Sequence, residues 1–582
     1  MQKFKQLAGS IREFKKPTAI TIALIVCEVF LEVLIPFMTA ELVNSIKAGA
    51  EMSYVAKKGI LLICMAFISL ACGSTAGFTC SKAASGFSRN LRHDLFEKIQ
   101  SFSFQNVDKF SEASLVTRLT TDISNVQMAF MMIIRTAIRC PLMIIFSVTM
   151  AYIMGGALAT MFVVIIPVLL GGLILVAKKA MPAFRAVFRK YDLLNESVEE
   201  NVRAMRVVKG FAREEFEKEK FNTASGNIAK DFTKAERIVA INTPLMQFCI
   251  YFNMIFVLTI GAKMIITSHG EVIDVGQISA MLSYGVQVLM SLMMVGAIYV
   301  ILTMSAESAL RICEVLDESP AITNPETPVT TVTDGSIEFN DVSFKYSANA
   351  EMNALSDINL KIDSGMTVGI LGLTGAGKTT LIQLIPRLYD ATEGTVKVGG
   401  RNVREYDLDV LRSAVSVVLQ KNLLFAGTIR ENLLWGNPEA TDEEIRQACA
   451  LAQAEEFIES FPDKYETHIE QGGTNVSGGQ KQRLCIARAL LRKPKILILD
   501  DSCSAVDMKT DALIREGFRS YIPETTKIII AQRVASVQDA DMIIVMESGT
   551  IIARGSHSEL LQNCEAYREV YEQQTNGGEE NA

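Results

Sequence analysis

Residues 366–380 read MTVGILGLTGAGKTT, an apolar run followed by a glycine-rich turn and the start of a further apolar stretch. The apolar run predicts a buried strand, and the residues after the turn predict a helix. Glycines at such a turn let backbone N–H groups point at a phosphate, and the helix N-terminus adds positive potential. The stretch therefore predicts a phosphate-binding loop made of Gly372, Leu373, Thr374, Gly375, Ala376, Gly377, Lys378, Thr379 and Thr380.

The spacing of this loop assigns roles to its last residues. Lys378 is expected to reach the β- and γ-phosphates of a nucleotide, and Thr379 to ligate Mg²⁺. A second apolar run, KILIL at 495–499, ends in Asp500, which is expected to hold the same metal ion, directly or through water. ATP and Mg²⁺ are therefore the expected cofactors.

The distribution of charge divides the chain near residue 306. The 582 residues are 49% hydrophobic, and long stretches before residue 306 carry no charge, whereas the later part has the charge density of a soluble protein. Such a shift predicts a membrane part followed by a water-soluble part. The net charge of −7 argues against nucleic acid as a partner.

The uncharged runs predict six membrane-spanning helices. In lipid, the backbone N–H and C=O groups of a single span can form their hydrogen bonds only within a helix. Gly155 and Gly156 offer a tight turn between the third and fourth spans. We expect a membrane domain over 1–315, a proline-containing linker over 316–335 and a second domain over 336–582. The expected spans are about 18–46, 59–81, 131–154, 157–177, 238–262 and 275–306.

The basic residues predict the orientation of these spans. With the N-terminus inside, the inner segments 1–17, 82–139 and 178–237 carry 27 Lys and Arg, whereas the outer segments carry 4. Excess positive charge marks the cytoplasmic side. We therefore expect a multi-pass protein of the plasma membrane with both termini in the cytoplasm.

Two carboxylates lie within the first expected span. Glu28 and Glu32 are four residues apart and so share one helix face. A carboxylate inside a membrane is costly and usually functional, so the pair could line a substrate cavity that favours cations. The alternative is an internal ion pair with Arg135 or Arg139 near the start of the third span.

Further motifs in the second half carry a family resemblance. Ser477, Gly478, Gly479 and Gln480 lie between the two strands described above and resemble the signature motif of ABC ATPases. Gln420 lies in a segment similar to the Q-loop of ABC exporters, which serves both the metal and the attacking water. Tyr346 resembles the aromatic residue that stacks on adenine, and residues 504–507 resemble the D-loop.

The resemblance extends into the membrane part. Residues 108–122 and 206–221 are similar to the inner segments that carry the two coupling helices of ABC exporters. The chain thus resembles a bacterial multidrug-type half-transporter. This resemblance implies an all-α membrane domain of six transmembrane helices followed by an α/β P-loop ABC ATPase domain. It also implies a lipid bilayer and a second half-transporter as partners, with Ser477–Gln480 facing the ATP of the opposite subunit.

Two positions depart from the family pattern. Asp501 stands where the family has the glutamate that acts on the attacking water, and Gln532 stands where it has the switch histidine. A carboxylate that is one methylene shorter is pulled back, and a misplacement near 1 Å can cost about 100-fold in rate. Loss of both groups, with the nucleotide-holding residues kept, resembles the slow-site subunit of a heterodimeric exporter.

We therefore expect ATP-driven export of hydrophobic or amphipathic small molecules, either drugs or lipids, by alternating access. The alternatives are a regulatory subunit that moves no cargo and a homodimeric exporter of lipids or peptides. Apolar cavity walls do not name the cargo.

Overall fold

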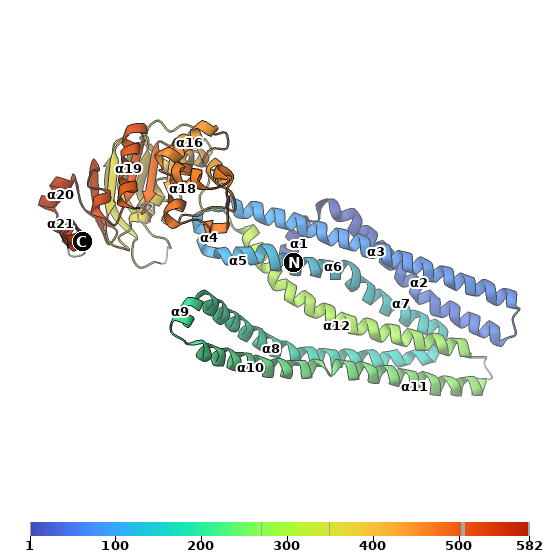
Figure 1. Cartoon of the computed structure of the whole chain (residues 1–582). Helices are drawn as coiled ribbons and strands as arrows, with labels where there is room; N and C mark the ends of the chain where they lie inside the picture. The colour runs from blue at the N-terminus through green and yellow to red at the C-terminus, as the bar shows by residue number, and fades with distance from the viewer. Residues whose placement is uncertain (1, 269–270, 348–349, 502–506, 580–582) are drawn as a thin grey trace. The chain divides into compact units, whose positions relative to one another are not determined.

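The computed structural model describes residues 2–268, 271–347, 350–501 and 507–579, and the chain forms two compact units (Figure 1). The first unit contains the chain up to Gln100 together with Glu112–Glu318. The second unit contains Ser101–Ser111 together with the chain from Ser319 onward. Each unit has its own buried apolar core.

The described residues of the first unit form helices joined by short connections. Its elements are α1 (Gln2–Gly9), η1 (Arg12–Phe14), α2 (Lys15–Lys47), α3 (Met52–Gln100), α5 (Glu112–Thr117), η2 (Arg118–Asp122), α6 (Ile123–Met132), η3 (Ile133–Ala137), α7 (Ile138–Gly155), η4 (Gly156–Thr160), α8 (Met161–Arg203), α9 (Met205–Gly210), α10 (Glu214–Val239), α11 (Asn242–Ser268) and α12 (Val275–Asp317).

The described residues contain five helical stretches that are long and apolar enough to cross a membrane. They are Arg12–Lys47, Met52–Gln100, Glu112–Arg203, Glu214–Ser268 and Val275–Asp317. The six expected spans fall within these five, because the stretch Glu112–Arg203 contains the third and fourth spans and reverses between them. The reversal uses Gly156, whose φ of 51° suits glycine, and the chain runs out along α7 and back along α8 (Figure 1).

Small side chains let the long helices approach closely. α2 and α3 lie side by side (Figure 1), and the buried face of α3 includes Ala76, Ala83 and Gly86. A Cβ atom on Gly86 would lie 2.2 Å from the ring of Phe14, so only glycine fits there. This contact packs α3 tightly against the segment that precedes α2.

The second unit mixes strands and helices. Its elements are α4 (Phe104–Phe110), β1 (Ile337–Phe344), β2 (Leu355–Ile362), β3 (Thr367–Leu371), α13 (Lys378–Leu384), β4 (Glu393–Val398), β5 (Arg401–Asn402), η5 (Val403–Glu405), α14 (Leu408–Ala414), β6 (Val415–Val418), β7 (Gly427–Thr428), α15 (Ile429–Leu434), α16 (Asp442–Leu451), α17 (Glu455–Ser460), η6 (Lys464–Glu466), β8 (His468–Ile469), η7 (Gln471–Gly473), α18 (Gly478–Leu490), β9 (Ile496–Asp500), α19 (Met508–Tyr521), β10 (Thr526–Ile530), η8 (Val534–Ser536), β11 (Met542–Glu547), β12 (Thr550–Gly555), α20 (His557–Asn563) and α21 (Glu565–Glu579).

A six-stranded sheet forms the centre of this unit, in the order β12-β11-β3-β10-β9-β6. All of its strands run parallel except β12, which closes the edge in the antiparallel direction. Ile530 at the end of β10 pairs with Ile370 of β3 on one side and with Asp500 of β9 on the other. The carboxyl ends of these strands therefore meet at one edge, which is where open parallel sheets bind ligands.

Two other sheets and a group of helices complete the second unit. An antiparallel sheet has the order β2-β1-β4-β5, and β7 pairs with β8. The strands β9 and β10 are buried along their whole length, as expected for strands covered on both faces.

The chain differs from the sequence-based expectation at two segments. Residues 101–111, which we expected to belong to the membrane domain, belong to the second unit. Their contacts explain this assignment, because Asn106 Nδ2 donates a hydrogen bond of 2.9 Å to the carbonyl of Ser319 and Asn106 Oδ1 accepts one of 3.0 Å from the backbone of Ala321. The connection after the last span also begins slightly later than expected, since α12 continues to Asp317.

Candidate functional site: a phosphate loop at the sheet edge

The loop after β3 turns sharply before α13 begins. Gly377 caps α13 with a φ of 90°, and a Cβ there would lie 2.9 Å from the carbonyl of Ala354. Lys378 folds back over the loop, and its Nζ donates to the carbonyls of Gly372 at 2.6 Å and Leu373 at 2.9 Å. Burial lowers the pKa of Lys378, while Asp500 and Asp501 oppose that shift. A phosphate would offer this ammonium stronger, charged acceptors than the two carbonyls.

Asp500 lies at the end of a buried strand and faces Thr379. The hydroxyl of Thr379 donates to Asp500 Oδ2 at 3.0 Å, and Asp500 as a residue is 3% exposed. Burial raises the pKa of Asp500, as does Asp501, whereas the Thr379 hydrogen bond and Lys378 lower it. A hydroxyl and a carboxylate oxygen at this spacing suit a hard cation such as Mg²⁺. The donor set therefore fits Mg²⁺ once phosphate oxygens complete the coordination.

The carboxylate of Asp501 accepts hydrogen bonds from two amides. Gln532 Nε2 donates to Asp501 Oδ2 at 2.8 Å, and Gln420 Nε2 donates to the same oxygen at 3.3 Å. Gln420 follows β6, Asp501 follows β9 and Gln532 follows β10, so the three parallel strands bring together residues far apart in sequence. Asp501 and Gln532, the two residues that depart from the family pattern, are therefore in direct contact.

The C-terminal helix supports the segment around Gln532. Gln574, on α21, donates to the carbonyl of Gln532 at 2.9 Å and accepts from the backbone N–H of Val534 at 2.8 Å. No motif in the sequence indicated this contact, because it depends on a polar residue of a helix whose partner is distant in the chain.

The phosphate-binding loop, Asp500, Asp501, Gln420 and Gln532 surround one pocket of about 510 Å³. Most of the sequence-predicted residues line it, namely Tyr346, Thr374, Gly375, Ala376, Gly377, Lys378, Thr379, Thr380, Gln420, Asp500, Asp501 and Gln532. Gly372 and Leu373 do not line it, but their carbonyls accept the hydrogen bonds from Lys378. The pocket is also lined by residues that belong to none of the predicted motifs, namely Met352, Asn353, Ala354, Ile530, Ser548 and Gly549. Gly549 sits in the turn between β11 and β12, where a Ser-Gly pair gave only a turn signal.

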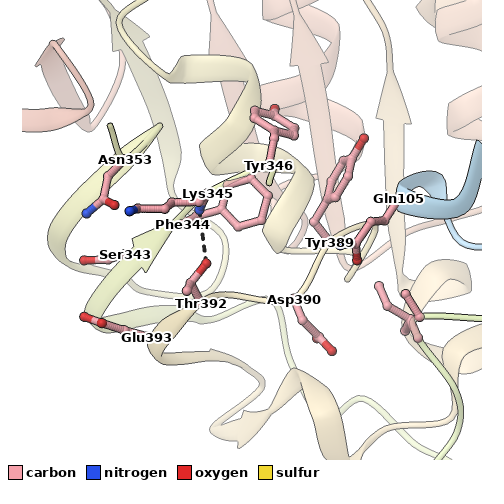
Figure 2. A pocket seen from close by; sticks show the side chains of 12 residues that line it. Gln105, Ser343, Phe344, Lys345, Tyr346, Asn353, Tyr389, Asp390, Thr392 and Glu393 are labelled. Atoms are coloured by element: carbon pink, nitrogen blue, oxygen red, sulfur yellow. Dashed lines mark hydrogen bonds between the residues drawn. The ribbon is translucent and has the colours of Figure 1, made fainter. Parts of the chain in front are cut away.

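Tyr346 separates this pocket from a second hollow of about 620 Å³, shown in Figure 2. The Tyr346 hydroxyl lies 3.0 Å from Thr380 Oγ1, and its ring meets the ring of Tyr389 edge to face at 5.2 Å. Gln105, from α4, lines the second hollow beside Tyr389 (Figure 2). A base stacked on Tyr346 would therefore be separated from α4 by two aromatic rings, those of Tyr346 and Tyr389.

Tyr389 also binds α4 directly. Its hydroxyl donates to Asp108 Oδ2 at 2.6 Å, and its ring packs on Phe104 at 6.1 Å. Burial and the Asp108 carboxylate both raise the pKa of Tyr389 well above its usual range, so the phenol stays protonated as the donor.

The signature residues form the start of α18 and do not line the nucleotide pocket. Ser477 is the N-cap, and its Oγ accepts from the backbone N–H of Gln480 at 3.3 Å while Gln480 Oε1 accepts from the backbone of Ser477 at 2.9 Å. This capping box leaves Gly478 and Gly479 in the first turn with backbone donors directed out of the helix start. Residues 504–506 of the expected D-loop lie outside the described residues.

The carboxylates of the first span form ion pairs with Arg139. The guanidinium lies 2.7 Å from Glu32 and 3.5 Å from Glu28. Glu32, but not Glu28, also lines a cavity of about 920 Å³ within the first unit. The structure therefore shows the ion pair, with Arg139, and places Glu32 at a cavity wall, whereas a role of the pair in binding substrate stays a prediction.

Comparisons with known protein families agree with this geometry. A family model described as "ABC transporter transmembrane region" matches residues 18–292, and one described as "ABC transporter" matches residues 355–504.

Curated relatives match along most of the chain. An uncharacterized ABC transporter ATP-binding protein, YfiB of Bacillus subtilis, is 34% identical over 96% of this chain and 97% of its own length. A fatty acid ABC transporter ATP-binding/permease protein of Mycobacterium bovis is 32% identical over 83% of this chain and 75% of its own length.

A solved structure of a bacterial Atm1-family ABC exporter with ATP bound has the same fold. It superposes with a TM-score of 0.82 at 21% identity and covers 96% of this chain and 98% of that one.

Proposed function

Because this chain belongs to the ABC transporter family, with a transmembrane region and an ATPase in one polypeptide, we propose that it is one half of an ATP-driven exporter. Its cargo is a class of amphipathic small molecules, drugs or lipids, moved outward by alternating access. The observation that carries the proposal is the fusion, in one chain, of a helical unit containing a 920 Å³ cavity and a unit containing a phosphate loop. The fatty acid relative supports lipids among the possible cargoes.

The residues of the second unit bind and orient the nucleotide in this proposal. Tyr346 stacks on the adenine, the backbone N–H groups of the loop hold the phosphates, and Lys378 pairs with the β- and γ-phosphates. Thr379, Asp500 and Gln420 are the residues that hold Mg²⁺, which when bound neutralises charge on the phosphates.

A second subunit completes the ATP site. Ser477, Gly478, Gly479 and Gln480 lie outside the pocket formed by their own chain, so in this proposal their donors serve the ATP of a partner half-transporter. ATP then lies between two subunits and holds them together until hydrolysis releases them. The assembly sits in the plasma membrane, with both termini in the cytoplasm.

The hydrolytic site of this chain is slow in the same proposal. The shortened carboxylate of Asp501 accepts hydrogen bonds on Oδ2 from Gln420 and Gln532, so this oxygen is engaged by two amides rather than by an attacking water. Gln532 donates hydrogen bonds but cannot carry the positive charge of a histidine. The partner is then a different half-transporter, which supplies a complete glutamate and histidine and has an altered signature motif.

Purification of the chain alone and together with its partner tests this assignment. We expect ATP turnover of the chain alone to be lower than that of the complex by about 100-fold, the cost of a misplaced group near 1 Å. Asp501→Asn in the complex is expected to leave most turnover intact, because the other site carries the flux. Robust turnover by the chain alone, or loss of turnover on Asp501→Asn, would count against the slow site.

A further inference from the structure

The cavity of the first unit has an apolar, adaptable wall. Its residues come from α2, from the segment α6–η3–α7 and from α12, and six methionines are among them: Met131, Met132, Met143, Met290, Met293 and Met294. Methionine is unbranched and polarizable, so such a wall adjusts to acyl or aromatic tails of different shape. A volume of about 920 Å³ is large enough for a drug-sized or lipid-sized ligand.

The two carboxylates near this cavity both form ion pairs with Arg139. Arg139 Nη2 donates to both carboxylate oxygens of Glu32 at 2.7 Å, and its Nη1 lies 3.5 Å from Glu28. The Glu28 side chain is 12% exposed and does not line the cavity. The cavity therefore offers no unpaired carboxylate from this pair, and the expectation that it favours cations loses its basis.

Arg135 is the charged side chain of the wall that lacks such a partner. It lines the cavity and is exposed, and among the described residues no carboxylate lies within 4 Å of it. Glu28, which pairs with Arg139, does not line the cavity beside Arg135. Arg135 is carried by η3, a π-helical segment of Ile133–Ala137, and such interruptions of α-helices are frequent at functional sites.

We propose that this cavity binds amphipathic anions, with a carboxylate or phosphate head group on Arg135 and an apolar tail along the methionine wall. The inference rests on the proposed function, since it names the cargo class of the exporter. A guanidinium presents donors in a fork that matches carboxylate and phosphate oxygens. Arg135 is exposed at the cavity, so its donors are open to a ligand, and an anionic head group there forms a charge-assisted hydrogen bond.

Three amphiphiles with the same sixteen-carbon tail test the head-group preference. The full-length chain, with its partner where one is required, is placed in nanodiscs of neutral phosphatidylcholine, and binding of hexadecanoate, hexadecan-1-ol and hexadecyltrimethylammonium is measured against empty discs. We expect hexadecanoate to bind at least about tenfold more tightly than the alcohol, the effect of one charge-assisted hydrogen bond. A further measurement with hexadecyl phosphate distinguishes carboxylate from phosphate head groups.

Substitution of Arg135 tests the assignment of the site. Arg135→Gln is expected to weaken hexadecanoate binding by about tenfold or more and to leave hexadecan-1-ol binding unchanged, which also shows that the cavity has folded. Arg135→Lys keeps the charge and is expected to retain most of the binding. Arg185→Gln, on the exposed surface of α8 and away from the cavity, is the matched control and should change neither.

Arg139→Gln gives an independent result of opposite sign. It frees Glu28 and Glu32, so the preference is expected to shift towards hexadecyltrimethylammonium. Equal binding of all three amphiphiles, or unchanged hexadecanoate binding in Arg135→Gln, would overturn the proposal. If ATP turnover and transport persist in that case, the exporter function stands without this cargo class. If the anion preference holds but amphiphile does not change ATP turnover and ATP does not change amphiphile binding, the binding inference stands and the export function fails.

Discussion

Asp501 shows how one methylene group can alter an ATP site. Its carboxylate is held at 2.8 Å by Gln532 and at 3.3 Å by Gln420, in the position where a longer side chain would reach further into the pocket. The residue also adopts a φ of 47°, so its backbone leaves the strand in the left-handed region. The shortened side chain of Asp501 is thus in direct contact with Gln532, which donates a hydrogen bond to its Oδ2.

Restoration of both groups is the first prediction. The double variant Asp501→Glu with Gln532→His is expected to raise ATP turnover of this chain by about ten- to 100-fold, because the carboxylate advances by about one bond length and the histidine can carry positive charge. Steady-state phosphate release measures the change. Asp363→Glu, an exposed residue of the second unit, is the control. Turnover no higher than that of the original chain would show that this site is slow for another reason.

Asp500 provides a prediction about stability. Burial raises its pKa in the folded state above the ordinary value near 4, so the ionised form that prevails at pH 7 opposes folding. The unfavourable contribution of Asp500 to stability without nucleotide should therefore become smaller as the pH falls towards that raised pKa. Asp500→Asn should raise the melting temperature of nucleotide-free protein at pH 7 by about 2 °C, as expected for about 1 kcal/mol in a domain of this size.

The measurement is thermal unfolding followed at several pH values. The stabilising effect of Asp500→Asn should shrink as the pH decreases, because protonation of Asp500 removes the same charge. A variant that is less stable than the original at pH 7 would contradict this account.

At the scale of a single element, α18 depends on its cap. Ser477 and Gln480 form a reciprocal capping box, so the hydroxyl expected to serve a partner's phosphate also holds its own helix start. Ser477→Ala is expected to destabilise the second unit by about 1 kcal/mol, whereas Ser477→Thr should keep the cap. Trp435 is the single tryptophan of the chain and lies in this unit, so its fluorescence during urea unfolding measures the loss selectively. Equal midpoints for the alanine variant and the original would exclude a structural role of the cap.

At the scale of the whole molecule, the segment Ser101–Ser111 links the two units, because both of its ends continue into the chain of the first unit. This segment belongs to the second unit, yet it follows α3 and precedes α5 of the first unit. Tyr389 binds its Asp108, and Tyr389 also meets Tyr346 at the nucleotide pocket. A shift of the base on Tyr346 can therefore reach α4 through two aromatic rings.

Interruption of this contact should uncouple ATP turnover from cargo. Tyr389→Phe removes the hydrogen bond to Asp108 but keeps the ring, so basal ATP turnover of the complex should change less than twofold while its stimulation by amphiphile falls by about tenfold. Tyr521→Phe, at an exposed position, is the matched control. Parallel loss of basal and stimulated turnover would indicate that Tyr389 serves ATP binding instead.

The sequence by itself was sufficient for the features that arise locally. The glycine-rich turn between a strand and a helix predicted the loop of Lys378 and Thr379, and apolar runs predicted the membrane-spanning helices, because lipid permits no other backbone conformation for a single span. It also indicated Asp501 and Gln532 as departures, since each lies at a fixed distance from a motif.

Only the tertiary structure decided which side chains meet. It paired Arg139 rather than Arg135 with Glu28 and Glu32, and it joined Gln420 and Gln532 on one oxygen of Asp501. It also assigned Ser101–Ser111 to the second unit. Hydropathy and motif spacing describe one segment at a time, whereas these partners come from helices and strands far apart in sequence, and their contact depends on how those elements pack.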